Sequence, residues 1–457
     1  MKPAFRPAFL DYTVPCDPGT PVRLTVHPPP GTTVAVDDGP AHRHPFTRSV
    51  DLAPGRAAEL RFVGPRRSRT YRVRCLPGDF PRWRVRRNGT PQADWYLVTP
   101  NIGGGGGYGI VFDSHGVPVW WIRTSPAPFG MDLLRNGHFV WTNYVALSPN
   151  ADRFGERTLD GRLVRTYGVV GGSTNQHDLE FLPNGHALVI AYPHRDGVDL
   201  SAYGGPEDAT VLDGEIQEVD QQGRLVWSWK TKDHIPLAAS ERWLRRQIAK
   251  PTIRQYDGRP VYDLVHVNSV EPDGRRIVFS ARYLEAVYAI DRGTGRVAWK
   301  LGGTHTARSL KIEDDPHAAE DFGGQHDARL TGGGRRLTFF DNGTLRDRPP
   351  RAVEFALDLK HRRARLLQAV AFPPAFTSHC CGGARLLPGG DWVVSWGDTP
   401  WITELSPAGR RVLSIRFVGR YASYRAIPVL PGRLSRAALS RGMDALTRRA
   451  ANSRTQR

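Results

Sequence analysis

Three histidines occupy the same position in three copies of one sequence motif. The copies run from His177 to Gly185, from His266 to Gly274 and from His326 to Gly334, and each Gly precedes a run of β-forming residues. Side chains at equivalent positions of a radial repeat fold point toward one axis, so we expect the three imidazoles to meet. An imidazole can act as a nucleophile or as a general acid, and the motif therefore predicts an active site.

Two further polar residues accompany these histidines. Asn268 lies two residues after His266, so the alternation of a strand places both on one face. Arg282 follows one hairpin later, and its guanidinium offers a fixed fork of donors that matches the oxygens of phosphate or sulfate. The set predicts an anion pocket in which one His attacks the bound group and another protonates the leaving oxygen. Asp178 and Asp327 directly follow their histidines, so the same alternation turns both away from the pocket.

Two other functions are compatible with the three histidines. Three His side chains have the ligand count of a catalytic zinc site, which would make the protein a metal-dependent hydrolase. The cationic Arg282 argues against this, because carboxylates are the usual neighbours of metal ligands. The second alternative is a non-catalytic propeller that binds a ligand or serves as a scaffold. We expect no metal and no cofactor.

The histidine motif is one half of a longer repeat between residues 93 and 430. In the other half an apolar run leads through Asp-x-x-Gly to a second apolar run that usually ends in Trp, and its copies are Ile110–Trp120, Ile216–Trp227, Val287–Trp299 and the degenerate Ile402–Leu413. Asp-x-x-Gly is a hairpin turn signal. A repeat of about 45–60 residues suits a four-stranded propeller blade. The sequence therefore predicts an all-β, six-bladed β-propeller rather than a solenoid.

The propeller is expected to have a flanking region on each side. Residues 1–92 contain short alternating strands without the repeat, which predicts a small N-terminal β-sandwich domain. Residues 431–457 form a basic tail that is rich in Arg. Four of its apolar residues have helical spacing, which predicts a short surface helix: Leu439, Met443, Leu446 and Ala450.

Composition narrows the possible partners. The formal net charge is +18, and Arg supplies most of the positive charge. Because the charges are scattered and no nucleic-acid module accompanies them, we expect small anionic substrates and no nucleic acid. No segment is apolar enough for a transmembrane helix, and the first residues lack the apolar core of a signal peptide. As written the sequence predicts a cytoplasmic protein, or a periplasmic or secreted one if the true start lies upstream. It carries no signal for an oligomeric state.

The sequence has four cysteines. Cys16 and Cys75 can bridge two strands in an oxidising compartment or remain two buried thiols. Cys380 and Cys381 are adjacent, so we expect them not to bond to each other. No C-x-x-C pair occurs, which argues against a thiolate zinc site.

Five segments together resemble the arylsulfotransferase (aryl-sulfate sulfotransferase) family. They give the order His-x-Asn, Arg and Gly-x-His-Asp, and they are Asp263–Gly274, Ser280–Tyr283, Ile290–Gly303, Gly324–Asp327 and Phe340–Gly343. The resemblance covers about residues 93–430. It implies a six-bladed propeller that moves a sulfuryl group between phenols without a nucleotide sulfate donor. The best-known members carry a signal peptide, whereas this sequence shows none.

The resemblance also implies a role for each site residue. His326 would be the nucleophile that carries a sulfohistidine. His266 and His177 would bind sulfate or serve the leaving and attacking phenols. The sulfuryl oxygens would be held by three polar side chains, of which the last aligns least well: Asn268, Arg282 and Ser378.

Overall fold

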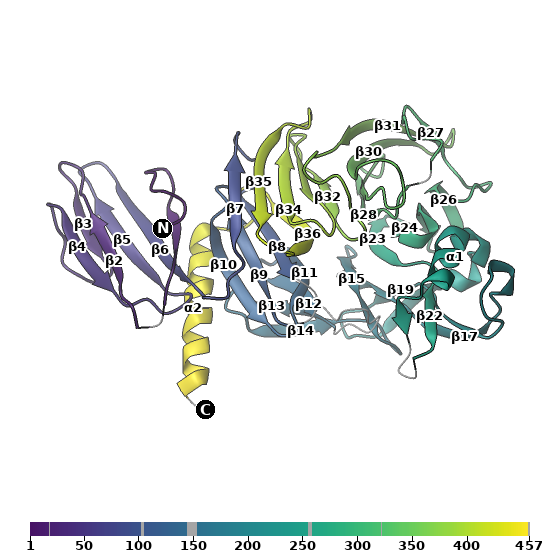
Figure 1. The fold of residues 1–457 in the computed structure, drawn as a ribbon, viewed down its shortest axis with the longest axis horizontal. Coiled ribbons are helices and arrows are strands. Elements are labelled where there is room, and N and C mark those ends of the chain that lie inside the picture. Colours follow the sequence, from purple (N-terminus) through teal and green to yellow (C-terminus); the bar gives the residue numbers. More distant parts are fainter. Residues whose placement is uncertain (18, 102–104, 144–152, 255–257, 321, 456–457) are drawn as a thin grey trace.

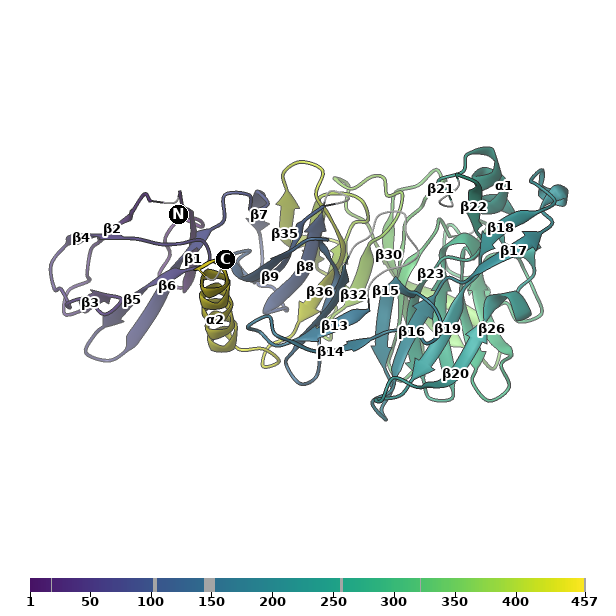
Figure 2. The same ribbon diagram turned by 90° about the horizontal axis from the view of Figure 1, so that it is seen from below.

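The computed structural model describes residues 1–17, 19–101, 105–143, 153–254, 258–320 and 322–455. These residues form a mostly β structure of many small sheets with few helices. Figure 1 shows an elongated molecule in which the N-terminal strands lie at one end and the larger group of sheets at the other. Figure 2 shows the same order from a second direction, with helix α2 between the two groups.

The N-terminal residues form two sheets that share one hydrophobic core. The first has the order β1 (Asp11–Pro15), β6 (Ser68–Leu76), β5 (Ala57–Val63) and β3 (Thr33–Val36), and the second pairs β2 (Val22–Val26) with β4 (Phe46–Val50). Tyr12 and Val34 are buried between them. Cys16 and Cys75 form a disulfide across the parallel β1–β6 pair. The structure therefore has the disulfide and not the two free thiols.

Six four-stranded antiparallel arrangements follow in the described residues. In chain order the first three are β8 (Trp95–Asn101), β9 (Gly107–Asp113) and β10 (Pro118–Thr124) with β36 (Ala422–Val429); β11 (Pro128–Leu133), β12 (Phe139–Asn143), β13 (Phe154–Arg157) and β14 (Leu163–Tyr167); and β15 (Thr174–Phe181), β16 (Ala187–Ala191), β19 (Glu215–Val219) and β20 (Leu225–Lys230).

The remaining three are β23 (Val267–Asp273), β24 (Arg276–Ala281), β25 (Ala286–Asp291) and β26 (Val297–Gly302); β28 (His326–Thr331), β29 (Arg336–Asp341), β30 (Arg351–Asp358) and β31 (Arg363–Val370); and β32 (Gly383–Leu386), β33 (Trp392–Ser395), β34 (Trp401–Leu405) and β35 (Arg411–Phe417). A fifth strand extends each of the last two sheets: β27 (Lys311–Glu313) and β7 (Trp83–Arg87).

The edge strands of these sheets lie next to one another in a cyclic order. Strand β11 contacts β15, β15 contacts β23, β23 contacts β28, β28 contacts β32, β32 contacts β36, and β36 contacts β11. The sheets remain separate, and among the described residues no single sheet closes on itself. Strand β36 comes from the end of the chain but completes the first sheet by pairing with β8. The two ends of the repeat region are thereby joined.

The Asp-x-x-Gly segments form hairpin turns, as the sequence predicts. Between β9 and β10 the Gly116 amide donates to the Asp113 carbonyl, and the side chain of Asp113 accepts from the backbone of His115. Gly116 has a φ of 74°, a left-handed conformation that favours glycine. Asp220 and Gly223 repeat this arrangement between β19 and β20. Periodic turn residues therefore identify the hairpins correctly.

One further sheet interrupts the repeat and is not predicted by it. It contains β17 (His194–Val198), β18 (Ala209–Leu212), β22 (Pro260–Asp263) and β21 (Ile253–Arg254), and it includes a parallel β18–β22 pair. Its strands come from two insertions. The first lies between β16 and β19 and contains the 3-10 turn η1 (Ser201–Tyr203), and the second lies between β20 and β23 and contains the 3-10 turns η2 (Thr231–Asp233) and η3 (Leu237–Ser240) and the helix α1 (Glu241–Ala249). These residues lack the repeat motif, so the periodic pattern contained no signal for them.

The basic C-terminal segment forms the predicted helix, α2 (Arg436–Thr455). It is not simply a surface helix, because it packs against β10 and buries Leu439 and Met443. Arg74 of β6 forms an ion pair of 2.6 Å with Asp444 of α2. The helix therefore contacts both the N-terminal strands and the first sheet of the repeat. None of the described helices has the length and apolar character needed to cross a membrane.

Candidate active site

Irregular edge strands place the three histidines. His177 lies in β15 where the pairing register with β16 shifts, and His326 begins β28 at a similar shift. His266 immediately precedes β23, which also has a register shift, and its φ is 56°. A bulge leaves residues unpaired and redirects their side chains, often beside a functional site. Each copy of the motif thus has a register shift near the start of its strand, and the histidine lies at or next to that shift.

The structure brings the three imidazoles together. The ring centroids of His177 and His266 are 4.7 Å apart, and those of His266 and His326 are 6.4 Å apart. Tyr424 of β36 lies within 5.6 Å of His177 and 6.4 Å of His326. Phe129 of β11, at the equivalent position of another sheet, stacks on Tyr424 at 4.3 Å. Strands β11, β15, β28 and β36, together with the residue before β23, therefore supply one cluster of aromatic and imidazole rings.

The hydrogen bonds of His326 fix its tautomer. Its Nδ1 lies 2.9 Å from the Gly324 carbonyl oxygen and 2.8 Å from Asn342 Oδ1. The Nδ2 group of Asn342 donates to the Cys381 carbonyl and to Ser378 Oγ, so its oxygen must face the imidazole. Both neighbours of Nδ1 are acceptors, and Nδ1 therefore carries the proton. The neutral ring keeps its lone pair on Nε2.

The other two rings are held through Nδ1 by different partners. Nδ1 of His177 lies 2.5 Å from Asn175 Oδ1, and Nδ1 of His266 lies 2.6 Å from the buried carboxylate of Asp263. A carboxylate stabilises the imidazolium, whereas an amide oxygen adds no charge. The ring of His266 thus has a carboxylate partner, whereas the ring of His177 has a neutral one.

Burial and positive neighbours favour the neutral form of two histidines. Burial, followed by the charge of Arg282 and then His266, lowers the pKa of His326 well below its ordinary value. Burial, followed by His266 and then His326, does the same to the pKa of His177. Both rings are therefore unprotonated near neutral pH. His326 combines this state with a free Nε2, which are the properties of a nucleophile.

Arg282 supplies a cation to the site. It begins the short 3-10 turn η4 (Arg282–Leu284), and its guanidinium lies 5.2 Å from the ring of Trp243 and 5.0 Å from that of Tyr283. Its Nη2 group donates to the His379 carbonyl, and its Nη1 group donates to the Tyr283 hydroxyl at 3.2 Å. Within the described part of the chain these two partners are uncharged oxygens rather than carboxylates, and the Nε of Arg282 is buried without a hydrogen-bond partner. Such a guanidinium is suited to an anion.

Asn268 and Ser378 lie close to the histidines, but their polar groups are engaged elsewhere. Asn268 is fully buried, its Nδ2 donates to the Gln325 carbonyl, and its Oδ1 accepts from the Asp327 amide. The expectation that it shares a strand face with His266 is wrong in its geometry, because the bulge interrupts the alternation. Ser378 accepts from Asn342 and donates to the Cys380 carbonyl. These contacts make both residues supports of the site.

Asp178 and Asp327, which directly follow two of the histidines, take part in a different cluster of side chains. Both join a buried ion network with Arg329 and Arg425, in which each carboxylate lies within 3.1 Å of both guanidinium groups. Burial raises the pKa of Asp178, but Arg329 and Arg425 outweigh that effect and hold it at about 2. The network joins β15, β28 and β36, so it fixes the strands that carry His177, His326 and Tyr424.

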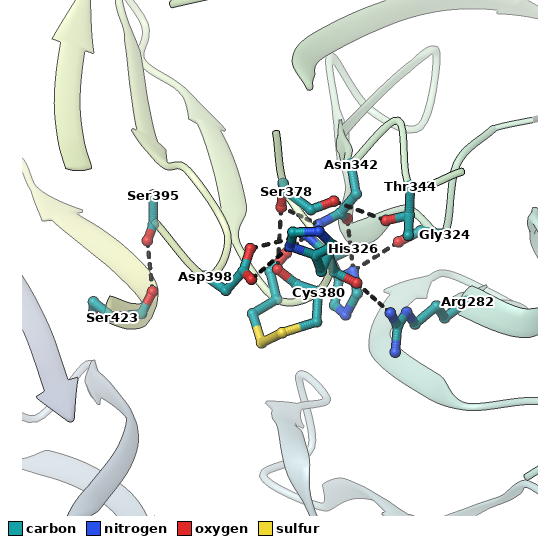
Figure 3. The surroundings of a disulfide bond; sticks show 12 residues. Arg282, Gly324, His326, Asn342, Thr344, Ser378, Cys380, Ser395, Asp398 and Ser423 are labelled. Atoms are coloured by element: carbon teal, nitrogen blue, oxygen red, sulfur yellow. Dashed lines mark hydrogen bonds and ion pairs between the residues drawn. A yellow bond between two sulfur atoms is a disulfide. The ribbon is translucent and has the colours of Figure 1, made fainter. Parts of the chain in front are cut away.

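A disulfide lies beside the support of His326. Figure 3 shows Cys380 near Ser378 and Asn342, with His326 behind them. Cys380 and Cys381 are bonded to each other, so the expectation for this pair is wrong. Cys381 has a left-handed backbone with a φ of 66°, and its carbonyl accepts the hydrogen bond from Asn342. The special backbone at this position explains why adjacency alone does not predict the state of the pair.

Sequence reasoning missed the partners that orient the histidines. They are Asn175, Asp263 and Asn342, which lie two residues before His177, three residues before His266 and one hairpin after His326. The first two have a local signal, because an amide or carboxylate just before each repeat histidine can reach its ring. It also missed three aromatic residues of the cluster: Tyr192, Tyr283 and Tyr424.

In the part of the chain that the structure describes, no group of three or more His, Cys, Asp and Glu side chains has an arrangement that could hold a metal ion. What the described residues assemble is a buried imidazole cluster with an unpaired guanidinium. The protein is thus mostly β, and its edge strands bring imidazole, aromatic and guanidinium groups together in one buried cluster.

The chain belongs to the Arylsulfotransferase (ASST) family, whose sequence profile matches residues 158–418. The match covers more than half of the chain and includes the three histidines and Arg282. No curated protein matches the chain. Similar solved structures include a protein of unknown function from Bacteroides caccae, with 12% identity over 74% of this chain and 99% of that one at a TM-score of 0.42. Another is a streptogramin B lyase, with 11% identity over 87% and 98% at a TM-score of 0.33.

Proposed function

We propose that this protein transfers a sulfuryl group from an aryl sulfate to a phenol through a covalent bond to His326, without a nucleotide sulfate donor. One observation carries the proposal. The Nδ1 proton of His326 is held by Gly324 and Asn342, which leaves Nε2 as the basic nitrogen, and Arg282 lies close enough to lower the pKa of this imidazole. Membership of the arylsulfotransferase family supports sulfate as the anion.

In the first half-reaction His326 displaces the aryl group. The Nε2 lone pair forms a bond to sulfur while the bond between sulfur and the aryl oxygen breaks. The aryl oxygen leaves with that electron pair and takes a proton from the imidazolium of His266, which Asp263 stabilises. Arg282 donates to the sulfuryl oxygens, where charge accumulates during the transfer. His177 lies next to His266 and donates a hydrogen bond from Nδ1 to the Asn175 oxygen, so its Nε2 lone pair can accept a hydrogen bond from the hydroxyl of a phenol.

In the second half-reaction an acceptor phenol reverses these steps. The phenol gives its proton to His266, and its oxygen forms a bond to sulfur while the bond between sulfur and Nε2 breaks. His326 recovers its lone pair, and His266 recovers its proton. The two half-reactions use one site in turn, so the protein need not bind both phenols together. The kinetics should then be ping-pong.

We also propose that the six antiparallel sheets are the blades of a six-bladed propeller. The cyclic contacts of β36, β11, β15, β23, β28 and β32 support this arrangement, since the innermost strands of blades surround a common axis. Strand β36 would close the ring by completing the first blade. On this proposal residues 93–430 are the catalytic domain and residues 431–457 an attached helix. Residues 1–92 form the N-terminal β-domain, except that β7 near their end joins the last blade by pairing with β35.

The test is a transfer assay with 4-nitrophenyl sulfate as donor and phenol as acceptor. We expect release of 4-nitrophenol together with formation of phenyl sulfate, and parallel lines in a double-reciprocal plot at several donor concentrations. A scaffold protein would release nothing. A hydrolase would form inorganic sulfate instead of phenyl sulfate.

A further inference from the structure

A cavity of about 600 Å³ lies directly beside the support of His326. Its lining includes Asn342, which holds the His326 ring, and Ser378, which holds Asn342. It also includes His379, whose carbonyl accepts from Arg282. The cavity is therefore lined by residues that contact His326 and Arg282, the proposed nucleophile and cation of the candidate active site. Its size is within the range of small-molecule sites.

Part of the lining is apolar, and two of its apolar side chains are exposed. Phe376 exposes 71% of its surface and Leu345 exposes 47%, and Phe372 and Pro373 complete this part of the wall. No other large hydrophobic residue among those described is as exposed as Phe376. Leu345 is held in a left-handed backbone with a φ of 61°. The left-handed backbone is unfavourable for a leucine, and exposing its side chain to water adds to the free-energy cost. Backbone strain of this kind tends to persist at functional sites.

The cations of the lining are already paired. Arg346 forms an ion pair of 3.1 Å with Glu285, and Arg348 forms one of 2.8 Å with Asp341. Each of these guanidinium groups thus has a carboxylate partner inside the protein, and Phe376 and Leu345 supply the exposed apolar surface of the cavity. The anionic part of a substrate would lie at Arg282, and the apolar part would lie here.

We propose that this cavity binds the aromatic ring of the substrate and selects phenols with extended, uncharged aryl groups. The inference rests on the proposed sulfuryl transfer and adds the residues that choose the aryl group, namely Phe376 and Leu345. Both side chains present apolar surface in the same cavity whose lining includes Asn342 and Ser378. An extended aryl group buries more of this surface than a single ring, and its binding is strengthened in proportion.

The experiment compares 2-naphthol with phenol as acceptors of sulfate from 4-nitrophenyl sulfate. We expect the wild type to prefer 2-naphthol, and Phe376→Ala to lower kcat/KM for 2-naphthol about tenfold more than for phenol, mainly through KM. Phe376→Leu should restore most of the preference. Leu345→Asn should also lower the preference for 2-naphthol, and asparagine is compatible with the left-handed backbone at this position. Leu163→Ala removes another exposed apolar side chain, on β14 and outside the lining of the cavity, and should keep the preference for 2-naphthol.

Calorimetric titration with 2-naphthol alone separates this inference from the proposed reaction. Binding that Phe376→Ala weakens supports the cavity even if no sulfate is transferred, and in that case only the reaction would be wrong. If transfer occurs but Phe376→Ala and Leu163→Ala have the same acceptor preference, the cavity does not select the aryl group. If wild type and Phe376→Ala bind 2-naphthol equally, the inference is overturned.

Discussion

Asn342 holds His326 through a hydrogen bond of 2.8 Å between its Oδ1 and the Nδ1 of the imidazole. Asn342 is fixed in turn by the Cys381 carbonyl and Ser378 Oγ, so it cannot rotate its oxygen away without losing both bonds. An amide in this place orients the ring without adding negative charge. The charge-neutral partner is consistent with a pKa of His326 that stays low enough for nucleophilic attack.

Asn342→Asp tests this relationship through the pH profile. A carboxylate beside Nδ1 favours the imidazolium and raises the pKa of His326, which burial and Arg282 otherwise lower. The protonated ring cannot attack sulfur, so the acid limb of kcat/KM should move to higher pH. The same change at Asn175 acts on His177 and should not raise this limb. A loss of rate with no movement of the limb would mean that Asn342 has only a structural role.

Arg282→Lys should lower kcat about 100- to 1,000-fold, because the ammonium keeps the charge but loses the planar fork. Arg242→Lys is the matched control, since the Arg242 guanidinium lies 5.3 Å from the same Trp243 ring but pairs with Glu285. We expect Arg242→Lys to have a kcat close to that of the wild type. Equal rates for Arg282→Lys and wild type would remove Arg282 from the proposed reaction.

Protein stability should depend on pH through His326. The buried ring has a lowered pKa when folded, whereas an unfolded histidine titrates near pH 6.5. Above that pH neither state binds the proton and stability is full. As pH falls through about 6.5 the unfolded state gains the proton first, and about 1.4 kcal/mol of stability is lost per pH unit for this group.

His326→Asn should remove that part of the slope. Urea unfolding of the wild type and the variant between pH 7 and pH 5 measures the difference, in which the titration of all other groups largely cancels. Parallel pH dependences for the two proteins would show that folding does not lower the pKa of His326.

Activity should survive chelation. The unpaired Arg282 guanidinium and the Asn and Asp partners of the imidazoles account for the proposed chemistry with residues of this chain alone. We expect 4-nitrophenyl sulfate turnover to be unchanged after dialysis against EDTA. Loss of turnover that zinc restores would instead favour the metal-dependent hydrolase considered from the sequence.

The sequence predicted the repeat because the signals for it are local. Asp-x-x-Gly turns and the spacing of His177, His266 and His326 follow from the hairpins, so they identify equivalent positions without any knowledge of the packing. The rest of the site depends on irregular geometry. Alternation along a strand failed between His266 and Asn268, because His266 has a left-handed backbone and β23 has a register shift directly after it.

Partners that lie far apart in sequence were also beyond prediction. Asn342 reaches His326 across a hairpin, and the Cys380–Cys381 pair contributes its backbone to Asn342. The ion network of Asp178, Arg329 and Arg425 joins three separate strands. Single-sequence periodicity indicates which residues face one axis, but it does not show which side chains bond to one another there.

The most direct test of the account is to find the sulfuryl group on the protein. Wild-type protein mixed with 4-nitrophenyl sulfate and no acceptor should release one equivalent of 4-nitrophenol in a burst. After quenching in alkali, mass spectrometry should find one added SO₃ group on His326. His326→Asn should give neither the burst nor the adduct. A sulfuryl group on His266 or His177, or a full burst from His326→Asn, would contradict the assignment of the nucleophile.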